Sequence, residues 1–395
     1  MRLIFVNRFY WPEENATSQL LVDLAEALAA LGHTVTILTS RPAGSALPTR
    51  EIHHGVTIRR VAGTRWQRLG LPGKAVDFLT FYVRVLGTLL FTAQRGDAVV
   101  ALTDPPLLGI GAWLAARFCG ARIFHWVQDI YPEIATHIGG HAWVQLFSPL
   151  RNFSWRRSDG CMVLGADMAA LVSATGVAPD KITVSPNWAP AGLDVQPHGA
   201  ADGLRKAWGL EGKFVVAYSG NLGRVHDLEP VLEAATQLRN DPDIAFVFIG
   251  GGAQRAHVQS IASARGLAHV HFHPAQPRAD LARTLALGDL HLVTLLPGCA
   301  ALVFPSKLYG IAAVGRPVAF VGPPDCEIAR LIESHGLGRA FDRNDVDGLS
   351  GYIRELRATP ELRQRLGAAA ARFYRDETGL PRAVSAWEKR LTSVT

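Results

Sequence analysis

Short apolar runs of strand length alternate along this chain with longer segments whose apolar residues recur with the helical period. Arg2 to Asn7 is such a run, Thr17 to Leu31 has the helical period, and Thr34 to Thr39 is a second run. The runs predict buried strands, and the longer segment predicts an amphipathic helix. A strand, a loop, a helix and a strand in this order are typical of a parallel sheet, in which ligand-binding loops follow the carboxyl ends of the strands.

The same alternation continues to the second half of the chain, with one interruption. Pro186 to Pro190 breaks the pattern, and the polar, Gly-rich segment Ala189 to Leu204 is typical of a linker. Two successive α/β stretches of similar length therefore predict two doubly wound domains. The further predicted strands are Asp97–Thr103, Ala121–Val127, Ser158–Leu164 and Lys181–Ser185 before the linker, and Lys213–Ser219, Ile244–Ile249, Val270–Pro274, Leu290–Leu296 and Pro317–Val321 after it.

Composition supports a globular protein with an anionic partner. The chain has 395 residues, 48% of them hydrophobic and 19% charged, which fits about two well-packed domains. Its net charge of +6 suits nucleic acid, acidic lipid headgroups or a sugar nucleotide equally well. The four cysteines, Cys119, Cys161, Cys299 and Cys326, lie far apart and form no CxxC pair. This spacing is typical of a reducing compartment and predicts no structural zinc.

One segment has a composition similar to that of a membrane helix. Val76 to Thr92 is apolar and nearly long enough to span a bilayer, but Asp77 and Arg84 interrupt it. A spanning helix needs about 20 apolar residues, so we expect either a buried core helix or one that lies in the membrane interface. The apolar run at the N-terminus is too short for a signal sequence, and we expect a cytoplasmic protein. The basic and aromatic residues that would attract headgroups are Arg65, Trp66, Arg68 and Lys74.

Polar residues follow two of the predicted strands in the first half. The loop Arg8 to Ala16 carries Tyr10, Glu13 and Asn15, which either line a ligand site or mark the start of the next helix. No GxGxxG follows the first strand, so the dinucleotide-binding fingerprint is absent. The strand ending at Val127 leads into Gln-Asp-Ile-Tyr-Pro-Glu, where Asp129 either orients and deprotonates a hydroxyl or caps the following helix.

Two loops in the second half are candidates for phosphate binding. Glycines in the loop Gly220 to Asp227 let the backbone approach a phosphate, and Arg224 or His226 would supply positive charge. Ser306 and Lys307 open a short helix whose N-terminal N–H groups would seat a phosphate. The alternative is that Ser306 caps the helix and Lys307 is solvated.

Several stretches, spread over nearly the whole length, together resemble a known family. They are FYWPEENATSQLLVDLAEALAALGHTVTILTS, TDPPLLGIGAWLAARFCGARIFHWVQDIYPE, YSGNLGRVHDLEPVLEAA, and GDLHLVTLLPG followed by FPSKLYGIAAVGRPVAFVG. In their order they resemble the retaining glycosyltransferases of family 4, which have the GT-B fold. The QDIYPE and PSKLYG forms are similar to a subset that builds bacterial surface polysaccharides, including the fucosamine-transferase-like enzymes of O-antigen and capsule assembly.

The resemblance implies an α/β chain of two Rossmann-like, doubly wound domains that face each other across a cleft. Residues 1–190 would bind the acceptor, residues 191–377 would bind the nucleotide sugar, and a helix in 378–395 would cross back to the first domain. The reaction would transfer a sugar from a nucleotide diphosphate with retention at the anomeric carbon, without a metal or another cofactor. Positive side chains and a helix N-terminus would stabilise the leaving diphosphate instead.

Combining the loops with the resemblance gives a set of candidate site residues. Asp129 is the catalytic candidate, with His125 as its partner. The other candidates are Gly220, Asn221, Gly223, Arg224, His226, Ser306, Lys307 and Leu308 for the diphosphate, Gly250, Gly251, His273, Pro274 and Glu327 for the base and ribose, and Tyr10, Glu13, Asn15 and Tyr131 for the acceptor.

This sequence departs from the family pattern in the donor half. Aligning on Gly315-Arg316-Pro317 puts Leu302 and Gly310 where typical members carry two glutamates, so the ribose and sugar contacts of those carboxylates are in doubt. The usual Arg and Lys of the first donor loop fall on Asn221 and His226, which shifts the diphosphate to Arg224 and Lys307.

We therefore expect a cytoplasmic enzyme, peripheral on the anionic inner membrane surface. It would move an N-acetylated or deoxy hexose, with UDP as the expected nucleotide, to a lipid-diphosphate-linked saccharide, and it would not bind nucleic acid. One alternative is a GT-B nucleotide-sugar epimerase, which needs no acceptor. The other is a non-catalytic scaffold that binds sugar nucleotides.

Overall fold

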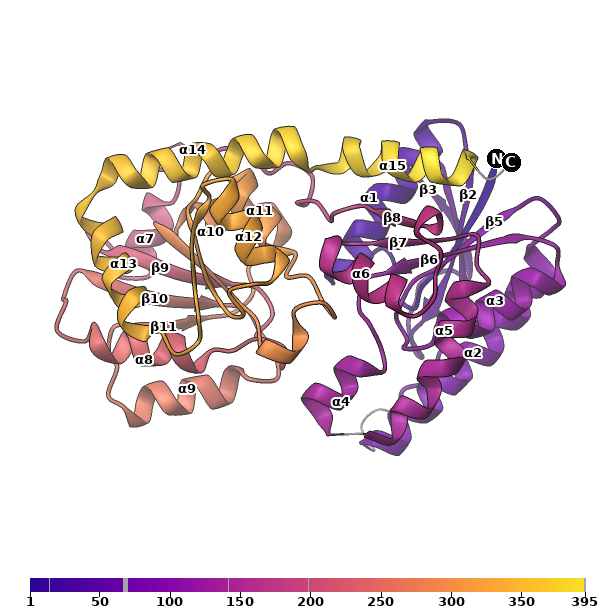
Figure 1. Ribbon diagram of the computed structural model, residues 1–395, viewed down its shortest axis with the longest axis horizontal. Coiled ribbons are helices and arrows are strands. Elements are labelled where there is room, and N and C mark those ends of the chain that lie inside the picture. Colours follow the sequence, from indigo (N-terminus) through magenta and orange to yellow (C-terminus); the bar gives the residue numbers. More distant parts are fainter. Residues whose placement is uncertain (14, 67–69, 141, 198, 394–395) are drawn as a thin grey trace. The chain divides into compact units, whose positions relative to one another are not determined.

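The computed structural model describes residues 1–13, 15–66, 70–140, 142–197 and 199–393. The chain divides into two compact units (Figure 1). Unit 1 consists of Met1–Asn187 together with Leu380–Thr395, and unit 2 is Trp188–Gly379. The first domain had been predicted to end at residue 190 and the C-terminal segment to begin at residue 378. Arg68, named above in the basic flank, lies outside the described residues.

The described part of unit 1 contains eight strands and the helices that cover them. In chain order its elements are β1 (Arg2–Val6), α1 (Ala16–Ala30), β2 (Thr34–Arg41), β3 (Arg50–His53), β4 (Val56–Ala62), α2 (Leu71–Thr92), β5 (Ala98–Ala101), α3 (Leu108–Phe118), β6 (Arg122–Val127), α4 (Glu133–Gly139), η2 (Ala142–Phe147), α5 (Ser148–Arg156), β7 (Gly160–Val163), α6 (Ala166–Ala174), η3 (Pro179–Lys181), β8 (Ile182–Val184) and α15 (Leu380–Thr392).

The unit 1 sheet has the strand order β3-β4-β2-β1-β5-β6-β7-β8, and only β3 is antiparallel to its neighbour. Alternate residues of β1 point to opposite faces: Ile4 and Val6 pack with residues of α2 and α3, whereas Phe5 contacts Trp387 of α15. From β1 the chain adds β2, β4 and β3 on one side of the sheet, and then adds β5 to β8 on the other side. The topological switch point, at which the strand order reverses, therefore lies between β1 and β5. Loops after these two strands therefore form the expected place for a ligand.

Unit 2 is a second doubly wound domain. In chain order its elements are α7 (Asp202–Ala207), β9 (Phe214–Ser219), α8 (Glu229–Gln237), β10 (Ile244–Ile249), α9 (Arg255–Ala264), β11 (Val270–His273), η4 (Arg278–Asp280), α10 (Leu281–Ala286), β12 (Leu290–Thr294), η5 (Pro297–Cys299), α11 (Lys307–Ala313), β13 (Val318–Val321), α12 (Glu327–Ser334), β14 (Gly338–Phe341), α13 (Val346–Ala358) and α14 (Pro360–Glu377).

The unit 2 sheet is parallel throughout its described strands, in the order β11-β10-β9-β12-β13-β14. Phe246 and Phe248 of β10 face a core built with α8, α9 and α13, whereas Ala245 and Val247 face α7 and α10. Strands buried on both faces read as continuous apolar runs, which is why these segments were recognisable in the sequence. The switch point here lies between β9 and β12.

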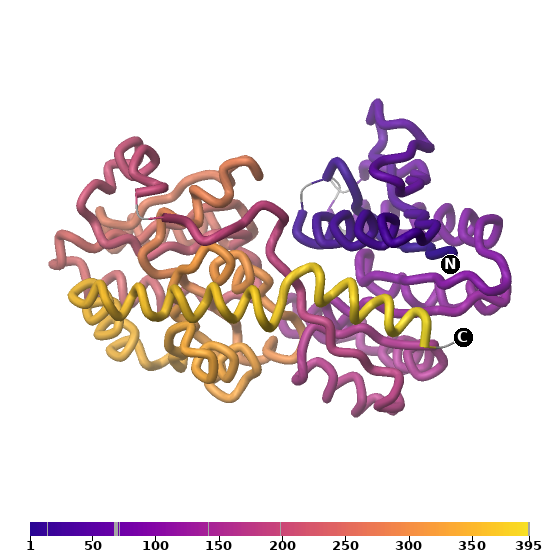
Figure 2. The backbone as a smooth tube through the Cα atoms, turned by 90° about the horizontal axis from the view of Figure 1, so that it is seen from above, coloured from indigo at the N-terminus to yellow at the C-terminus, as the bar shows by residue number. Residues whose placement is uncertain are grey.

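The last helix completes the first unit. Trp387 of α15 is fully buried, with its ring 5.1 Å from that of Trp126 on β6 in an edge-to-face arrangement. Figure 2 shows α15, in yellow near the C label, beside the indigo helix α1, and the two helices are in contact. The C-terminal residues thus belong to the core of unit 1.

The structure adds three strands that the sequence reading missed. The hairpin β3–β4 alternates polar and apolar residues around the turn His54-Gly55, and β14 is short. All three lie at or next to a sheet edge, where burial on one face only removes the continuous apolar run. Helix α2 also begins earlier than expected, at Leu71, because Pro72 occupies its first turn.

Candidate functional site

The donor-site candidates of unit 2 gather at the carboxyl edge of its sheet. Gly220 directly follows β9, Gly250 follows β10, His273 ends β11, and the segment leading to Lys307 follows β12. Parallel strands bring these loops to one edge, on both sides of the switch point. The structure therefore collects in one region residues that are up to about 90 positions apart in the sequence.

Lys307 contributes a buried ammonium group to this region. Its Nζ lies 3.7 Å from the centre of the Tyr218 ring and has no hydrogen-bond partner among the described residues. Burial lowers the pKa of its ammonium well below the usual value. Lys307 is therefore not solvated, and Ser306 makes no side-chain capping bond to α11, so the alternative structural roles proposed for both residues are wrong. A buried cation without an anionic partner is costly unless a ligand supplies one.

His226 lies beside Lys307 but is neutral. Its Nδ1 is 2.7 Å from the carbonyl oxygen of Thr294, so this nitrogen carries the proton and Nε2 is left as an acceptor. Burial, reinforced by the charge of Lys307, lowers the pKa of His226 to about 3. The expectation that His226 contributes positive charge is thus wrong, and the cationic candidates are Lys307 and Arg224, which is exposed.

Two glycines let the loops after β9 and β10 meet backbone to backbone. Gly220 has a φ of 131° and Gly250 a φ of 138°, values that other residues rarely adopt. A side chain at Gly250 would meet the carbonyl oxygen of Gly220, with its Cβ at only 2.1 Å. These positions therefore require glycine for close packing of the loops, whatever they bind.

The remaining donor candidates differ in their exposure and in whether their polar groups are free to contact a ligand. Leu308 is fully buried and its N–H donates to the oxygen of Pro305, so neither its side chain nor its N–H is available. The ring of His273 stacks on Trp208 at 3.6 Å, with the planes 5° apart. Of the others, Asn221, Gly251 and Pro274 are exposed, and Gly223 and Glu327 are half-buried.

In unit 1, acidic and basic side chains meet at the β1/β5 switch point. Arg8 follows β1, and its Nε lies 3.3 Å from the carboxylate of Asp104, which follows β5. Asp129 follows the next strand, β6, and burial together with the charge of Asp104 raises its pKa to about 6. Helix α4 begins after Pro132, so Asp129 is not its cap. A carboxyl with a pKa near neutrality is suited to exchanging a proton with a hydroxyl.

His125 lies on the same face of β6 as Asp129, and both line a small cavity of about 30 Å³. Burial lowers the pKa of His125 to about 4, so the imidazole is neutral. A side chain at Gly109 of α3 would meet its ring, with a Cβ 2.5 Å from Nδ1. The Nε2 atom has no partner among the described residues, and the cavity has room for about one water molecule.

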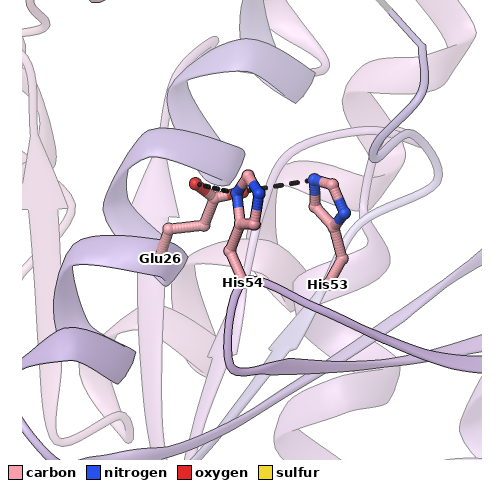
Figure 3. A group of neighbouring side chains, drawn as sticks. All are labelled: Glu26, His53 and His54. Carbon is pink, nitrogen blue, oxygen red and sulfur yellow. Dashed lines mark ion pairs between the residues drawn. The ribbon is translucent and has the colours of Figure 1, made fainter.

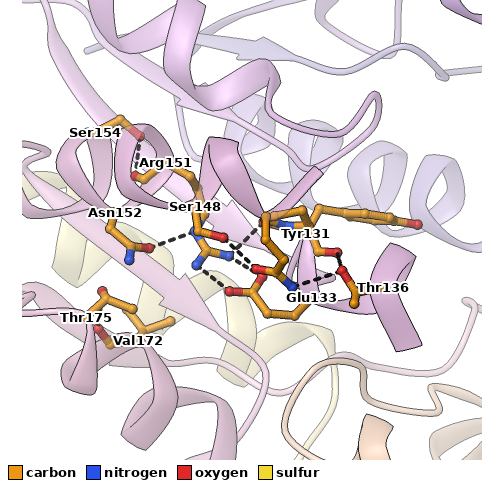
Figure 4. A network of polar contacts seen from close by, with 11 residues as sticks. Tyr131, Glu133, Thr136, Ser148, Arg151, Asn152, Ser154, Val172 and Thr175 are labelled. Carbon is orange, nitrogen blue, oxygen red and sulfur yellow. Dashed lines mark hydrogen bonds and ion pairs between the residues drawn. The ribbon is translucent and has the colours of Figure 1, made fainter. Parts of the chain in front are cut away.

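A buried arginine fixes the loop that carries Asp129. Both terminal nitrogens of Arg151, on α5, lie 2.7 Å from the two carboxylate oxygens of Glu133, and Nη1 also donates to the oxygen of Tyr131 (Figure 4). Burial and the charges of Asp129 and Asp104 raise the pKa of the Tyr131 hydroxyl. The network thus orders the segment from Asp129 to Glu133 against α5.

The loop after β1 is partly structural. Asn15 is the N-cap of α1, and its Oδ1 accepts a hydrogen bond of 2.9 Å from the N–H of Ser18. Tyr10 is buried, and desolvation by burial raises the pKa of its hydroxyl. Burial likewise raises the pKa of Glu13, partly offset by Arg8. Glu13 is thus the member of this loop that lies in the polar cluster with Arg8 and Asp104.

Comparison with known proteins decides the family. Residues 17–188 match the model of the glycosyl transferase 4-like domain, and residues 202–373 match that of the glycosyl transferases group 1. The putative colanic acid biosynthesis glycosyl transferase WcaI of Escherichia coli (strain K12) is 28% identical over 91% of this chain and 93% of its own. The probable glycosyltransferase WbjE of Pseudomonas aeruginosa is 28% identical over 90% and 89% of the two chains.

The chain belongs to glycosyltransferase family 4. Its fold is the GT-B fold: the structure of Anabaena Alr3699/HepE in complex with UDP-glucose superimposes over 100% of both chains with a TM-score of 0.76 at 14% identity. WaaG, a glycosyltransferase involved in lipopolysaccharide biosynthesis, superimposes with a TM-score of 0.73 at 16% identity, over 100% of this chain and 99% of its own.

Within this glycosyltransferase the two positions that depart from the family pattern are buried. Leu302 is 4% exposed, and a Cβ at Gly310 would lie 3.4 Å from a methyl group of Leu285. A glutamate at either position would need a polar environment that the apolar neighbours of Gly310 do not provide.

The glycosyltransferase also has residues at its site that sequence reasoning missed. Arg8, Asp104, Tyr218 and Thr294 were not among the candidates. Asp104 directly follows a predicted strand, so the rule that ligand loops follow strand ends could have found it. Tyr218 lies inside β9, and nothing in the sequence indicates that its ring lies under Lys307.

A large apolar surface distinguishes unit 1 of the glycosyltransferase. Helix α2 contacts α3, α3 contacts α5, and α5 contacts η2 (Figure 1). We define as the apolar face the large side chains of these elements that are 50% to 93% exposed: Leu79, Val83, Phe91, Leu114, Phe118, Trp143, Leu146 and Leu150. Patches of this kind on soluble proteins mark sites that bind a partner or a membrane.

Helix α2 provides part of this face and part of the core. Over Pro72–Thr92 it is the one helix of the described residues that is long and apolar enough to cross a membrane, judged by length and composition alone, and only 22% of its most apolar window is buried. Phe81, Val85 and Leu89 nevertheless pack in the core of unit 1. Crossing a membrane would remove them from that core. One face of α2 is therefore that of a core helix, and the opposite face carries the exposed apolar side chains.

Proposed function

We propose that this glycosyltransferase moves an N-acetylated or deoxy hexose from a nucleoside diphosphate sugar, with UDP as the nucleotide, to a lipid-diphosphate-linked saccharide in the synthesis of a surface polysaccharide. The name of WcaI, a putative colanic acid biosynthesis glycosyl transferase, supports the polysaccharide, and the Alr3699/HepE complexes with UDP and UDP-glucose support the nucleotide. Two relatives named GDP-mannose-dependent alpha-mannosyltransferase, 27% and 24% identical over 66% of this chain, make GDP the competing nucleotide.

The buried, unpartnered Nζ of Lys307 is the observation that carries the proposal for the donor. A diphosphate would supply the anionic partner that its ammonium lacks, and Arg224 at the same sheet edge would add a second charge. The developing charge on the leaving diphosphate would then be stabilised by side chains and backbone N–H groups, without a metal ion.

We assign the acceptor side of the reaction to unit 1. The acceptor hydroxyl oxygen would bond to the anomeric carbon while the bond from that carbon to the diphosphate oxygen breaks, with retention of configuration. The proton of the hydroxyl would pass to Asp129 or to the departing phosphate, which is why loss of Asp129 would slow the reaction without abolishing it. Neutral His125 would orient the acceptor or a water rather than supply charge.

The apolar face supports a peripheral place on an anionic membrane. Lys74 and Arg84 of α2 and Arg117 of α3 are basic, and Asp77 is the acidic residue of these two helices. Exposed aromatic and aliphatic side chains with basic neighbours are typical of elements that lie in the membrane interface. A lipid-linked acceptor would be met at that surface.

A thermal-shift series with nucleotides and nucleotide sugars tests the donor assignment. A ligand at one hundred times its dissociation constant stabilises the folded state by about 2.7 kcal/mol. We expect UDP and UDP sugars to raise the melting temperature while adenosine diphosphate does not. Selective stabilisation by GDP would assign the competing nucleotide, and a flat response to every nucleotide would contradict the proposal.

Product analysis separates the proposal from its two alternatives. An epimerase would convert the donor alone into an epimeric sugar nucleotide, whereas the transferase requires an acceptor. A scaffold would bind the donor in calorimetry without hydrolysis or transfer. We expect transfer that depends on both substrates.

A further inference from the structure

Three possible metal ligands lie together in unit 1, outside every residue assigned above to donor or acceptor (Figure 3). Glu26 comes from α1, His53 ends β3, and His54 lies in the turn between β3 and β4. One ligand atom from each lies within 4.8 Å of the others. The expectation of no structural zinc rests on the spacing of the cysteines, and this cluster contains none.

The three groups lie close enough to share one ion. Oε1 of Glu26 lies 3.6 Å from Nε2 of His53, and Oε2 of Glu26 lies 3.0 Å from Nδ1 of His54. A tetrahedral zinc ion with bonds of about 2.0–2.1 Å separates its ligand atoms by about 3.3 Å, a value between these two. Two imidazoles and one carboxylate form a zinc ligand set that leaves the fourth position to water.

The surroundings hold the ring of His53 and leave that of His54 adjustable. Trp11 stacks on the ring of His53 at 4.0 Å, and the ring of His54 stacks on the other side at 4.1 Å. The turn lies close to α1, where a Cβ at Gly55 would be 3.5 Å from Ala29. The side chain of His54 is 69% exposed and so has room to turn its lone pair toward an ion.

We propose that Glu26, His53 and His54 bind one zinc ion that ties the β3–β4 turn to α1. The ion is structural or regulatory and takes no part in sugar transfer. Its effect reaches the loop after β1 because Trp11 belongs to that loop, stacks on His53, and accepts a hydrogen bond of 2.8 Å at its backbone oxygen from Arg60 of β4. Nitrogen ligands favour zinc over magnesium and calcium, which prefer oxygen.

Calorimetry with zinc chloride on the full chain, free of any histidine tag, tests the site. We expect one ion per chain, and no uptake of magnesium. Glu26→Gln and His53→Gln should each weaken zinc binding at least tenfold. His54→Asn should do the same, and asparagine tolerates the left-handed backbone of this position, where φ is 45°. His33→Gln is the matched control, since His33 also faces a carboxylate, that of Glu388, outside the cluster, and it should keep full affinity.

Hydrogen exchange gives a second readout that does not depend on activity. Zinc should slow amide exchange in residues 50–56 and near Trp11 of the wild-type chain, and should leave exchange in His54→Asn unchanged. The proposal is overturned if the wild type takes up no zinc, or if the three variants bind it as tightly as the wild type, because the ion would then lie elsewhere. Neither result bears on donor binding, which the nucleotide series measures separately.

Discussion

At the scale of single residues, Lys307 combines burial of its ammonium with the absence of a hydrogen-bond partner among the described residues. Contact with the Tyr218 ring compensates part of the lost hydration, since a cation over an aromatic face gains about 0.5–2 kcal/mol. The rest of the desolvation free energy of the ammonium lowers the stability of the folded protein until an anion binds. Stability and donor affinity should therefore respond oppositely to the loss of this charge.

Lys307→Met tests this opposition. Removing the buried charge at similar volume should raise the melting temperature of the free protein. Losing a charge-assisted contact of about 1.5–3 kcal/mol should weaken nucleoside diphosphate binding roughly ten- to hundredfold in calorimetry. Lys206→Gln, at an exposed position of the same unit, is the control and should change neither quantity. Unchanged nucleotide affinity in Lys307→Met would contradict the assignment.

Asp129 predicts a pH dependence. Burial and Asp104 raise its pKa to about 6, so kcat/KM should fall as the pH drops through 6 and the carboxylate takes up a proton. Because the folded-state pKa exceeds the ordinary value, the free energy of unfolding should decrease as the pH rises from about 4 to 6. Asp129→Asn should lose both dependences and retain slow transfer. Full turnover with the acidic limb intact in this variant would exclude Asp129.

The sequence alone predicted Asp129, Lys307 and His226 as site residues, but it did not predict their protonation states. Asp129 and Lys307 follow strands or open a helix, and strand-end position is readable from the order of apolar runs. The neutrality of His226 was not readable, because it depends on Thr294 and Lys307, which are 68 and 81 positions away and meet it only through the parallel sheet. The capping role of Asn15 likewise depends on a contact, because its Oδ1 accepts the N–H of Ser18, while an acceptor contact of Asn15 stays a prediction.

At the scale of elements, α5 supports the loop that carries Asp129 through one side chain, that of Arg151. Arg151 is almost fully buried and holds both oxygens of Glu133, while Glu133 is itself only 24% exposed. Such a pair contributes little relative to an apolar pair, yet breaking it leaves a partly buried carboxylate unpaired.

Arg151→Ala should lower the free energy of unfolding by about 3–5 kcal/mol and reduce kcat for transfer, because the segment from Asp129 to Glu133 loses its support. Urea denaturation and steady-state kinetics measure the two effects. Arg156→Ala is the control, since Arg156 lies on the same helix and donates only to the oxygen of Thr175 among the described contacts. Equal effects in the two variants would show that Arg151 has no special role.

The apolar face extends over four neighbouring elements, α2, α3, η2 and α5, and its role in membrane binding can be tested by mutation. Combining Phe91→Ser on α2 with Phe118→Ser on α3 should reduce cosedimentation with vesicles of phosphatidylglycerol and phosphatidylcholine at least tenfold. Phe91 is 93% and Phe118 is 85% exposed, so the core should be unaffected. Ile52→Ser, at a 73% exposed position on β3, is the matched control. Undiminished vesicle binding would show that another surface carries it.

The sequence predicted the strands that are buried on both faces of a sheet, and it did not predict β3, β4 and β14, which lie at or next to a sheet edge. Ile244–Ile249 was predicted with the bounds that the structure gives, because every residue of β10 is buried. The hairpin β3–β4 was missed because its partly exposed residues, such as Ile52 and His53, do not form an apolar run. The exposed face of α3 and α5 was missed for a related reason, since apolar residues on a helix read as core until the neighbouring layer is known.

At the scale of the whole molecule, unit 1 is discontinuous in the sequence. Its core includes Trp387, fully buried against Trp126, from a segment that follows the whole of unit 2 in the chain. The family resemblance implied a C-terminal helix that crosses back to the first domain, and the contacts of Trp387 with Phe5 and Trp126 place this helix in the core of unit 1.

Trp387→Ala should destabilise unit 1 by about 3–5 kcal/mol through the cavity it leaves. Hydrogen exchange read by mass spectrometry should show loss of protection in β6 and in α1, while β9 and β10 of unit 2 keep theirs. Trp143→Ala removes the same side chain from a 65% exposed position and should change stability by less than about 0.5 kcal/mol. Equal loss of protection in both units would contradict the division.

The position of α15 also has a consequence for synthesis of the protein. Residues of unit 1 leave the ribosome first, but their core lacks Trp387 until the 192 residues of Trp188–Gly379 and most of α15 have been made. At about 5–20 residues per second this interval lasts roughly 10–40 s. The apolar surface that will receive α15 is exposed to chaperones and neighbouring chains throughout that time, although it belongs to the part translated first. The first unit to be made is therefore the last to finish folding.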